Sequence, residues 1–422
     1  MLQERYGQLA GYLAQFDRTL LGLNFADLVQ ASLAPGDLFR ILHHPRQRFE
    51  AESQIALEFH QAEPIDYLLI TQEEVGGLWN DAPRNLLTLS PGHWMEFAYY
   101  PLARHAAETG LGIDANDLIA KPDLIGYYHR VPARFEQGTR IHTYERATRI
   151  EPDPRGFRVT TADVSFLRET WARDRSRPPI PQPQDDLSAA PTRQYTCRYL
   201  IYAAGQRCIL RPLGVPGEDL PVVAARYDRP EDFPGPRVAV IGGGRSADWA
   251  ATELHDAGRQ VYYVMRQPRE RHWALIGDSR QGLPYYARLA QLLEERTPRL
   301  EPLYRTRVVR IDPAGEGGVL TLEVDGTERQ LEVDHVVRET SGWADYSLFS
   351  GFPDLQLVEK RDKYRFQVHQ ARTRAHNYES IDIPNLYLGG YLAQDIGLVV
   401  IAMHGTTYAI AGDILQREGR LP

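Results

Sequence analysis

Residues 237–267 read RVAVIGGGRSADWAATELHDAGRQVYYVMRQ. The apolar run VAVI is typical of a buried parallel strand, and the three glycines 242–244 follow it directly. A stretch with helix-forming composition comes next, and VYYVM forms a second apolar run. The glycines fit the pattern G-x-G-x-x-G/A, with Ala247 in the last place, in the strand and helix context that this motif requires. The stretch therefore predicts a dinucleotide-binding β-α-β unit.

Each small residue of this motif has a physical purpose. Gly242 permits the tight turn, Gly244 lets a pyrophosphate approach the backbone, and Ala247 allows the helix and strand to pack closely. Arg245 and Ser246 begin a helix whose N-terminus would face the phosphates. A glycine-rich turn without a ligand is the alternative interpretation.

The second strand of the unit indicates which nucleotide is bound. NAD-binding units end this strand in an acidic residue, which accepts hydrogen bonds from the ribose. Here the strand ends at Arg266, with Arg269 and Arg271 close behind. Guanidinium groups pair well with a 2′-phosphate, so NADP is favoured over NAD. Alternatively, these arginines are a solvated surface cluster.

Composition excludes several classes of protein. The chain has 422 residues, enough for two domains, and a net charge of −8 with scattered basic residues. We therefore expect neither nucleic acid nor a membrane as partner. Cys197 and Cys208 are too far apart for a C-x-x-C pair, which disfavours a dithiol reductase, and no histidine spacing suggests a metal site. The start of the sequence lacks signal-peptide features, so we expect a cytoplasmic protein.

The remaining sequence follows a strand-loop-helix order. Residues 1–63 have a helical pattern, 66–71 form a short apolar run, and 174–193 are a proline-rich loop. Asp325-Gly326 predicts a hairpin turn. The end of the chain, from residue 385, has the pattern of a strand, a loop and a closing helix. The repeated order indicates a parallel α/β architecture.

Three further segments carry a resemblance: VGGLW (75–79), LIYAAG (200–205) and YLGGYLAQDIG (387–397). With them the chain resembles the two-dinucleotide-binding-domain flavoproteins, that is, the flavin-containing monooxygenase-like superfamily of FAD-dependent pyridine nucleotide oxidoreductases. The resemblance implies two Rossmann-like domains, with an NADP-binding domain (221–341) inserted into a discontinuous FAD-type domain (64–220 and 342–422). It also implies contacts with FAD by Gly76, Gly77, Trp79, Ala204, Gly205, Gly390 and Asp395.

One family feature is missing from the sequence. The G-x-G-x-x-G turn that holds the FAD pyrophosphate does not occur in residues 1–63. Three explanations stay open: this atypical helical segment replaces the turn, FAD has been lost and NADP binding kept in a non-redox role, or a partner chain completes the site, for example in a homodimer.

The resemblance implies an NADPH-dependent flavin oxidoreductase acting on a small-molecule substrate or electron acceptor. In the monooxygenase branch, oxygen transfer would proceed through a flavin peroxide. The oxygenating members carry F-x-G-x-x-x-H before the second glycine motif, but here only Tyr227 lies near the histidine position, which weakens that variant. His404, at the start of the closing helix, is the candidate catalytic residue. The alternative is a degenerate flavoprotein that serves as an NADP(H)-binding scaffold or regulatory subunit.

Overall fold

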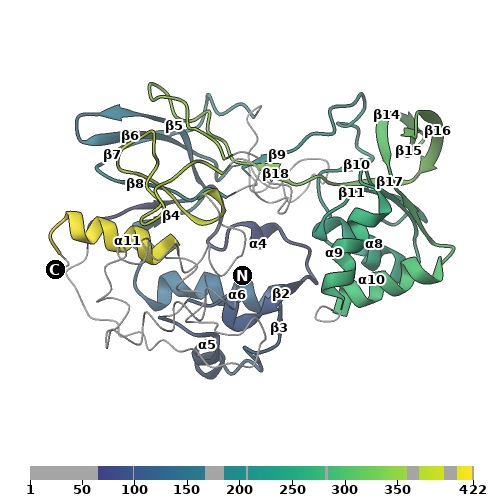
Figure 1. The fold of residues 1–422 in the computed structure, drawn as a ribbon, viewed down its shortest axis with the longest axis horizontal. Helices are drawn as coiled ribbons and strands as arrows, with labels where there is room; N and C mark the ends of the chain where they lie inside the picture. Colours follow the sequence, from purple (N-terminus) through teal and green to yellow (C-terminus); the bar gives the residue numbers. More distant parts are fainter. Residues whose placement is uncertain are drawn as a thin grey trace.

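The computed structural model forms two α/β halves that lie side by side, joined by two chain crossings (Figure 1). No helix among the described residues is long and apolar enough to cross a membrane. Three predictions lie outside the described residues, namely the helical segment 1–63, Asp395 and His404. The structure describes residues 65–97, 99–166, 185–205, 208–280, 284–358, 370–393 and 406–420.

The half that contains the glycine motif is built on a five-stranded parallel sheet. In spatial order its strands are β10 (Val223–Ala224), β17 (His335–Glu339), β11 (Arg237–Gly242), β12 (Gln260–Val264) and β13 (Leu300–Leu303). Its helices are α8 (Arg245–Asp256), α9 (Arg269–Ser279) and α10 (Pro284–Glu295), with the short η4 (Pro230–Asp232). An antiparallel meander follows, made of β14 (Thr306–Ala314), β15 (Gly317–Val324) and β16 (Thr327–Val333).

The apolar run of β11 explains how these layers assemble. Val238 and Val240 belong to the core that includes α8 and α10, whereas Ala239 and Ile241 belong to the core formed with the meander. Successive side chains of a strand point to opposite faces, so a strand covered on both faces must be apolar throughout. The predicted strand-turn-helix-strand order of residues 237–267 is confirmed.

The hairpin predicted at Asp325-Gly326 is also confirmed, since it joins the paired strands β15 and β16. Both turn residues have positive φ angles, 48° for Asp325 and 81° for Gly326. Positive φ at both central residues is the condition for a type I′ turn, whose twist matches that of the flanking strands.

The other half contains short parallel pairs in place of one continuous sheet. β1 (Leu69–Ile70) pairs with β4 (Ile141–His142), and β8 (Leu200–Tyr202) pairs with β19 (Leu386–Leu388). Further antiparallel elements are the meander β5 (Glu145–Asp153), β6 (Gly156–Asp163) and β7 (Thr192–Cys197), and the pair β2 (Leu87–Pro91) and β3 (Leu118–Ala120). Its helices are α4 (Leu78–Asp81), α5 (Leu102–Thr109), α6 (Lys121–Arg134) and α11 (Thr406–Arg417), with the short η2 (Gly92–Trp94), η3 (Gly138–Arg140) and η5 (Gly390–Leu392).

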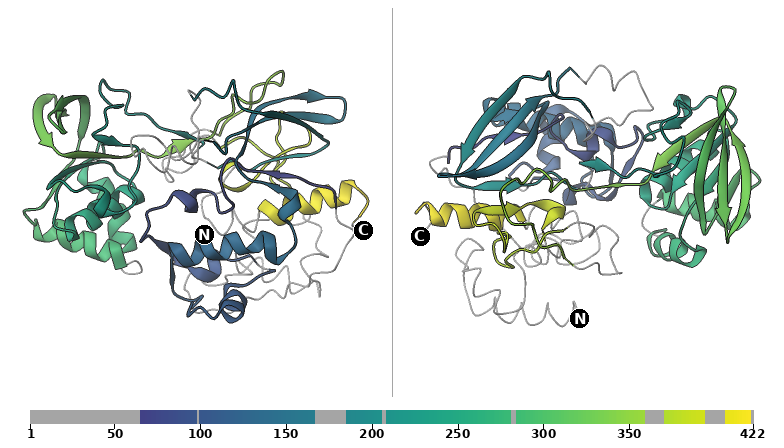
Figure 2. Two further views of the ribbon diagram at one scale, coloured as in Figure 1. Left: turned by 180° about the vertical axis from the view of Figure 1, so that it is seen from behind. Right: turned by 90° about the horizontal axis from the view of Figure 1, so that it is seen from above.

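The chain passes between the halves twice. The crossings contain β9 (Ile209–Leu210) and β18 (Gly342–Trp343), which pair antiparallel and run side by side in two views (Figures 1 and 2). The predicted domain boundaries, 220/221 and 341/342, fall on these crossings and stay a prediction.

Polar contacts beyond the crossings also tie the two halves together. The Arg226 guanidinium, next to β10, lies 3.0 Å from the Asp81 carboxylate at the end of α4. The Asn85 amide donates to Glu253 of α8 at 2.7 Å. Since both pairs join the segment after α4 to the NADP-type half, they fix the orientation of the two halves around the space between them.

Candidate dinucleotide-binding site

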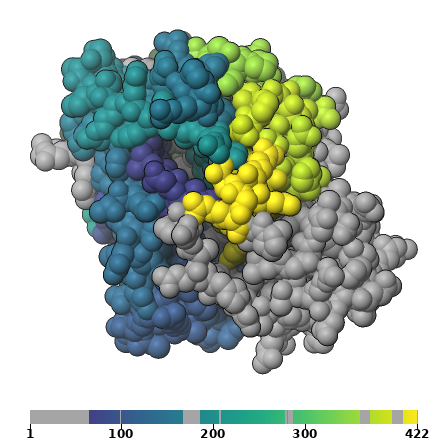
Figure 3. Space-filling model, turned by 90° about the vertical axis from the view of Figure 1, so that its left-hand side faces the viewer, coloured from purple at the N-terminus to yellow at the C-terminus, as the bar shows by residue number. Residues whose placement is uncertain are grey.

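A cavity of about 3590 Å³ extends between the two halves. Ligand pockets usually measure roughly 300–1,000 Å³, so this one has room for more than one dinucleotide. Figure 3 shows the first described residues of the chain, drawn in purple, set back in a hollow between neighbouring segments. The cavity brings together most of the residues that the sequence singled out: Gly76, Gly77, Trp79, Ala204, Gly205, Gly242, Gly244, Arg245, Ser246, Arg266, Arg271 and Gly390.

The first two glycines of the motif are required by close packing. A Cβ atom on Gly242 would lie 2.4 Å from the Glu339 carbonyl oxygen and 2.9 Å from the Ala247 Cβ. A Cβ atom on Gly243 would lie 2.7 Å from the Gln267 amide nitrogen, which donates to the Gly243 carbonyl at 3.0 Å. Gly242 lets β11, β17 and α8 approach one another, and Gly243 leaves room for the Gln267 side chain. Ala247 is fully buried.

Gly244 has a different environment. A Cβ atom there would meet nothing within 4 Å, and the φ of −121° is open to any residue. Gly244 is the N-cap of α8, with no side-chain cap, so the first amide groups of the helix face the cavity uncapped by any side chain. A helix start of this kind favours anions through its amides and its dipole. The free space at Gly244 therefore fits a pyrophosphate.

Three buried polar atoms near the glycine turn 242–244 have no hydrogen-bond partner among the described residues: Arg245 Nε, Gln267 Oε1 and Arg211 Nε. All three residues line the cavity. Buried donors normally find partners, so each unsatisfied group calls for an explanation. A bound dinucleotide would supply acceptors for the two arginines and a donor for the glutamine. By this test the residues present fit NADP.

The arginines after β12 differ in orientation. Arg266 and Arg271 are exposed and line the cavity, whereas the Arg269 guanidinium stacks over Trp273, 4.8 Å from the ring centre. Arg211, which follows β9 on the crossing, lines the cavity together with Arg266 and Arg271. Burial and the nearby charge of Arg266 lower the pKa of Arg211. The sequence missed Arg211, because its place beside Arg266 depends on the path of the crossing.

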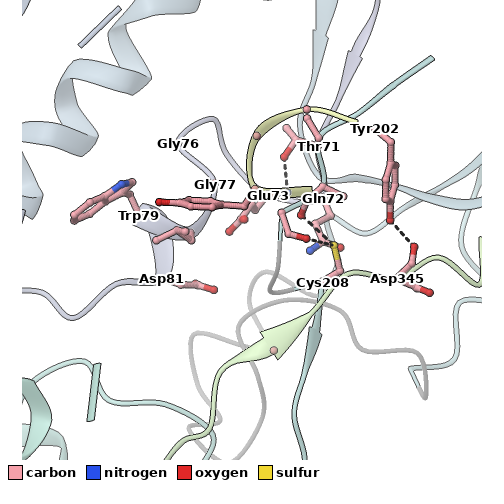
Figure 4. Close-up of a pocket in the computed structure, with 18 of the residues that line it drawn as sticks. Thr71, Gln72, Glu73, Gly76, Gly77, Trp79, Asp81, Tyr202, Cys208 and Asp345 are labelled. Carbon is pink, nitrogen blue, oxygen red and sulfur yellow. Dashed lines mark hydrogen bonds between the residues drawn. The ribbon is translucent and has the colours of Figure 1, made fainter. Parts of the chain in front are cut away.

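The opposite wall of the cavity comes from the other half (Figure 4). Gly76 and Gly77 have φ angles of 114° and 54° and form the turn before α4. Trp79 packs at the edge of the aromatic core around α6. After β1, Thr71 to Glu73 lie beside Cys208 in Figure 4. This wall offers glycine turns and an apolar surface to a ligand.

The ends of β8 and β19 form the third side of the cavity. Gly205 and Gly390 have φ angles of 74° and 63°, and a Cβ atom on Gly389 would lie 3.0 Å from the Ala203 Cβ. The two strand ends therefore meet through small residues. No G-x-G-x-x-G motif between a strand and a helix occurs among the described residues of this half, so these residues fit only part of FAD.

A buried ion pair forms part of this wall. Arg146 Nη2 and Asp345 Oδ2 are 3.9 Å apart, and Tyr202 donates its hydroxyl hydrogen to the Asp345 carbonyl (Figure 4). These contacts join β5, β8 and the segment after β18. Sequence reasoning gave no role to Arg146. Only the fold brings the two side chains together.

Neither cysteine is suited to thiol chemistry. Cys197 and Cys208 are both free, and burial raises the pKa of each thiol to about 11. A thiol acts as a nucleophile only in its ionised form, so both are poor nucleophiles at neutral pH.

Comparisons with known proteins define the class. Residues 189–390 match the family model "Pyridine nucleotide-disulphide oxidoreductase". Among solved structures, the bacillithiol disulfide reductase of Staphylococcus aureus is 19% identical, with a TM-score of 0.62, over 84% of this chain and 92% of that one. A flavin-containing monooxygenase from Stenotrophomonas maltophilia is 17% identical, with a TM-score of 0.52, over 84% and 91%.

This chain has the two-dinucleotide-binding-domain flavoprotein fold, which confirms the predicted fold class and the resemblance. The part of the chain that matches the family model, slightly less than half, is similar to the pyridine nucleotide oxidoreductases, a family that typically binds FAD and NAD(P)H. A ferredoxin–NADP reductase from Ignicoccus hospitalis is 40% identical over 78 residues, which is 18% of this chain and 26% of that relative. This chain thus matches about a quarter of the length of the curated relative.

Proposed function

We propose that this protein is an NADPH-dependent flavin oxidoreductase acting on a small molecule. The observation that carries the proposal is the single cavity into which both halves open. The glycine turn 242–244, between β11 and α8, lies on one wall of the cavity. The glycine turns after β1, β8 and β19 lie on the other walls. Hydride transfer between two cofactors requires that both lie in one continuous space.

The residues have distinct parts in this proposal. The amide groups at the start of α8 and the side chain of Arg245 bind the NADPH pyrophosphate. Arg266, Arg271 and Arg211 bind its 2′-phosphate. Gly76, Gly77, Ala204, Gly205 and Gly390 let FAD approach the backbone, and FAD when bound would accept the hydride. Water is excluded from the region between the nucleotides by the walls that the two halves contribute.

The acceptor of the electrons is less closely defined by the site. The high pKa values of Cys197 and Cys208 argue against a thiol relay by this chain. Transfer to a small molecule that enters the cavity, or to oxygen as in a monooxygenase, is therefore the favoured route. The cytoplasmic location expected from the sequence belongs to the same proposal.

A second candidate has its own support. The described residues on the FAD side hold no G-x-G-x-x-G turn, the motif that binds a pyrophosphate. A protein that has lost FAD would keep the NADP-binding turn 242–244 and act as a scaffold or regulatory subunit. Flavin binding distinguishes the two.

We expect the purified protein, incubated with FAD and then desalted, to retain flavin in near-equal molar amount, because the turns after β1, β8 and β19 leave room for the cofactor beside the backbone. The measurement is the visible absorbance of the desalted protein, with heat-denatured protein as control. Loss of all flavin on desalting, together with normal NADPH binding, would instead support the scaffold.

A further inference from the structure

A buried polar cluster joins three elements of the NADP-type half. At its centre is Asp248, which lies in the first turn of α8. One oxygen of this carboxylate, Oδ1, accepts a hydrogen bond from the Tyr263 hydroxyl at 2.6 Å and another from His272 Nε2 at 2.7 Å. Tyr263 belongs to β12 and His272 to α9, so a single carboxylate oxygen connects a strand and two helices (Figure 1).

The cluster cannot touch a bound nucleotide. Asp248, Tyr263 and His272 are fully buried, and none of them is among the residues that line the cavity. Burying charged and polar groups costs free energy, and apolar packing would hold the elements together without that cost. Hydrogen bonds, however, also fix distance and direction. The cluster therefore acts by setting the relative positions of α8, α9 and β12.

Both ends of the Asp248–His272 hydrogen bond lie close to positions assigned to phosphates. The Asp248 amide donates to the Gly244 carbonyl at 2.9 Å, so this carboxylate lies one helical turn from the proposed pyrophosphate position. His272 directly follows Arg271, which lines the cavity and is assigned to the 2′-phosphate. The buried hydrogen bond thus links the two phosphate positions from behind the cavity wall.

His272 holds the first turn of α9 in place. Of residues 269–272, His272 alone is buried and the others are exposed. The N-cap, Pro268, makes no side-chain hydrogen bond to the helix. The second ring nitrogen of His272, Nδ1, lies 3.2 Å from the Tyr304 hydroxyl. Because both ring nitrogens are hydrogen-bonded, the rotation of the turn is fixed as well as its position, and with it the direction of Arg271.

We propose that Asp248 and His272 are positioning residues that set the preference for a dinucleotide with a 2′-phosphate. The pair holds the first turn of α9 at a fixed distance from α8. Arg271 can then meet the 2′-phosphate while the start of α8 binds the pyrophosphate of the same molecule. The inference rests on the proposed function, because it concerns the specificity of that nucleotide site.

Tyr263 offers a matched control within the same cluster. It donates to the same oxygen of Asp248 as His272 does, over nearly the same distance. Its strand, however, is fixed by backbone pairing with β11 on one side and β13 on the other. Loss of the Tyr263 hydroxyl therefore removes one buried hydrogen bond without releasing α9.

The test compares His272→Phe with Tyr263→Phe. In each variant an aromatic ring remains and the hydrogen bond to Asp248 is lost. We expect the affinity ratio of NADPH to NADH, from titration of each nucleotide, to fall about tenfold in His272→Phe. The affinity for NADH should stay within about twofold of wild type, and so should the ratio in Tyr263→Phe.

Two further variants separate the effect on the ratio from a loss of stability. His272→Phe leaves a buried carboxylate with one donor fewer. Asp248→Asn/His272→Phe removes that charge, and the asparagine oxygen still accepts from Tyr263. We expect the same fall in the ratio with a higher unfolding temperature than that of His272→Phe. His272→Gln, whose amide nitrogen can take the place of Nε2, should restore the ratio to within about threefold of wild type.

A double-mutant cycle tests whether His272 acts through Arg271. In an Arg271→Gln background the guanidinium is absent, so His272→Phe should change the ratio by less than about twofold. An undiminished fall in that background would contradict the inference.

Amide hydrogen exchange tests the anchoring of α9 without any nucleotide. His272→Phe should speed exchange in residues 273–277 at least about tenfold, whereas Tyr263→Phe should not. Equal exchange in the two variants would show that His272 does not hold the helix.

The outcomes distinguish this inference from the proposed function. If the wild-type protein binds neither nucleotide, the proposed function is wrong, whatever the exchange of α9 shows. If the wild type prefers NADPH but the ratio is unchanged in His272→Phe, or falls equally in Tyr263→Phe, the positioning role is wrong and the proposed function stands.

Discussion

Replacing Gly244 by aspartate is expected to abolish NADPH binding while leaving the protein as stable as the wild type. The new Cβ meets open space, and the backbone angles are ordinary, so folding is not impaired. The carboxylate, however, lies at the start of α8, where the pyrophosphate would bind, and it repels that group. We expect the dissociation constant for NADPH to rise at least about 100-fold, or about 3 kcal/mol, measured by fluorescence titration.

The matched control for Gly244→Asp is Gly244→Asn, which has nearly the same size and no charge. It should weaken NADPH binding much less, because asparagine still donates hydrogen bonds. Thermal unfolding of both variants should agree with that of the wild type within a few degrees. If aspartate leaves NADPH affinity unchanged, the phosphates do not bind at α8.

Reversing the charge of Arg266 is expected to remove the preference for NADPH over NADH. Arg266 lies in the cavity with Arg271 and Arg211, and a carboxylate there repels the 2′-phosphate but accepts a hydrogen bond from the ribose of NADH. We expect the affinity ratio of NADPH to NADH to fall about 100-fold or more in Arg266→Glu. Titration of each nucleotide measures the ratio.

Arg269 provides the control for Arg266. It lies three residues away, but its guanidinium is held over Trp273, and it is not among the residues that line the cavity. Arg269→Glu should leave the ratio within about twofold of wild type. An equal fall in both variants would mean that general surface charge, and not a defined phosphate site, sets the preference.

The NADP-type half was largely predictable because its signals are local. The run VAVI, the three glycines and the helix that follows lie within one stretch of chain, so strand, turn and helix follow from short-range chemistry. The same is true of the Asp325-Gly326 turn. The position of Arg211 beside Arg266 was not predictable, because it depends on a crossing between the halves.

The FAD-type half was harder to predict because its elements are distant in the sequence. β8 and β19 pair across nearly two hundred residues of intervening chain, so only the resemblance assigned both Gly205 and Gly390 to contacts with FAD. The absence of the G-x-G-x-x-G turn from residues 1–63 could be read from the sequence.

The central claim is that NADPH reduces a flavin held in this cavity. The most direct measurement adds NADPH to FAD-loaded protein without oxygen and follows the visible absorbance of the oxidised flavin. The account predicts that this absorbance disappears with NADPH, and that it persists in FAD-loaded Gly244→Asp. Persistence of the absorbance in the wild-type protein, with NADPH demonstrably bound, would contradict the claim.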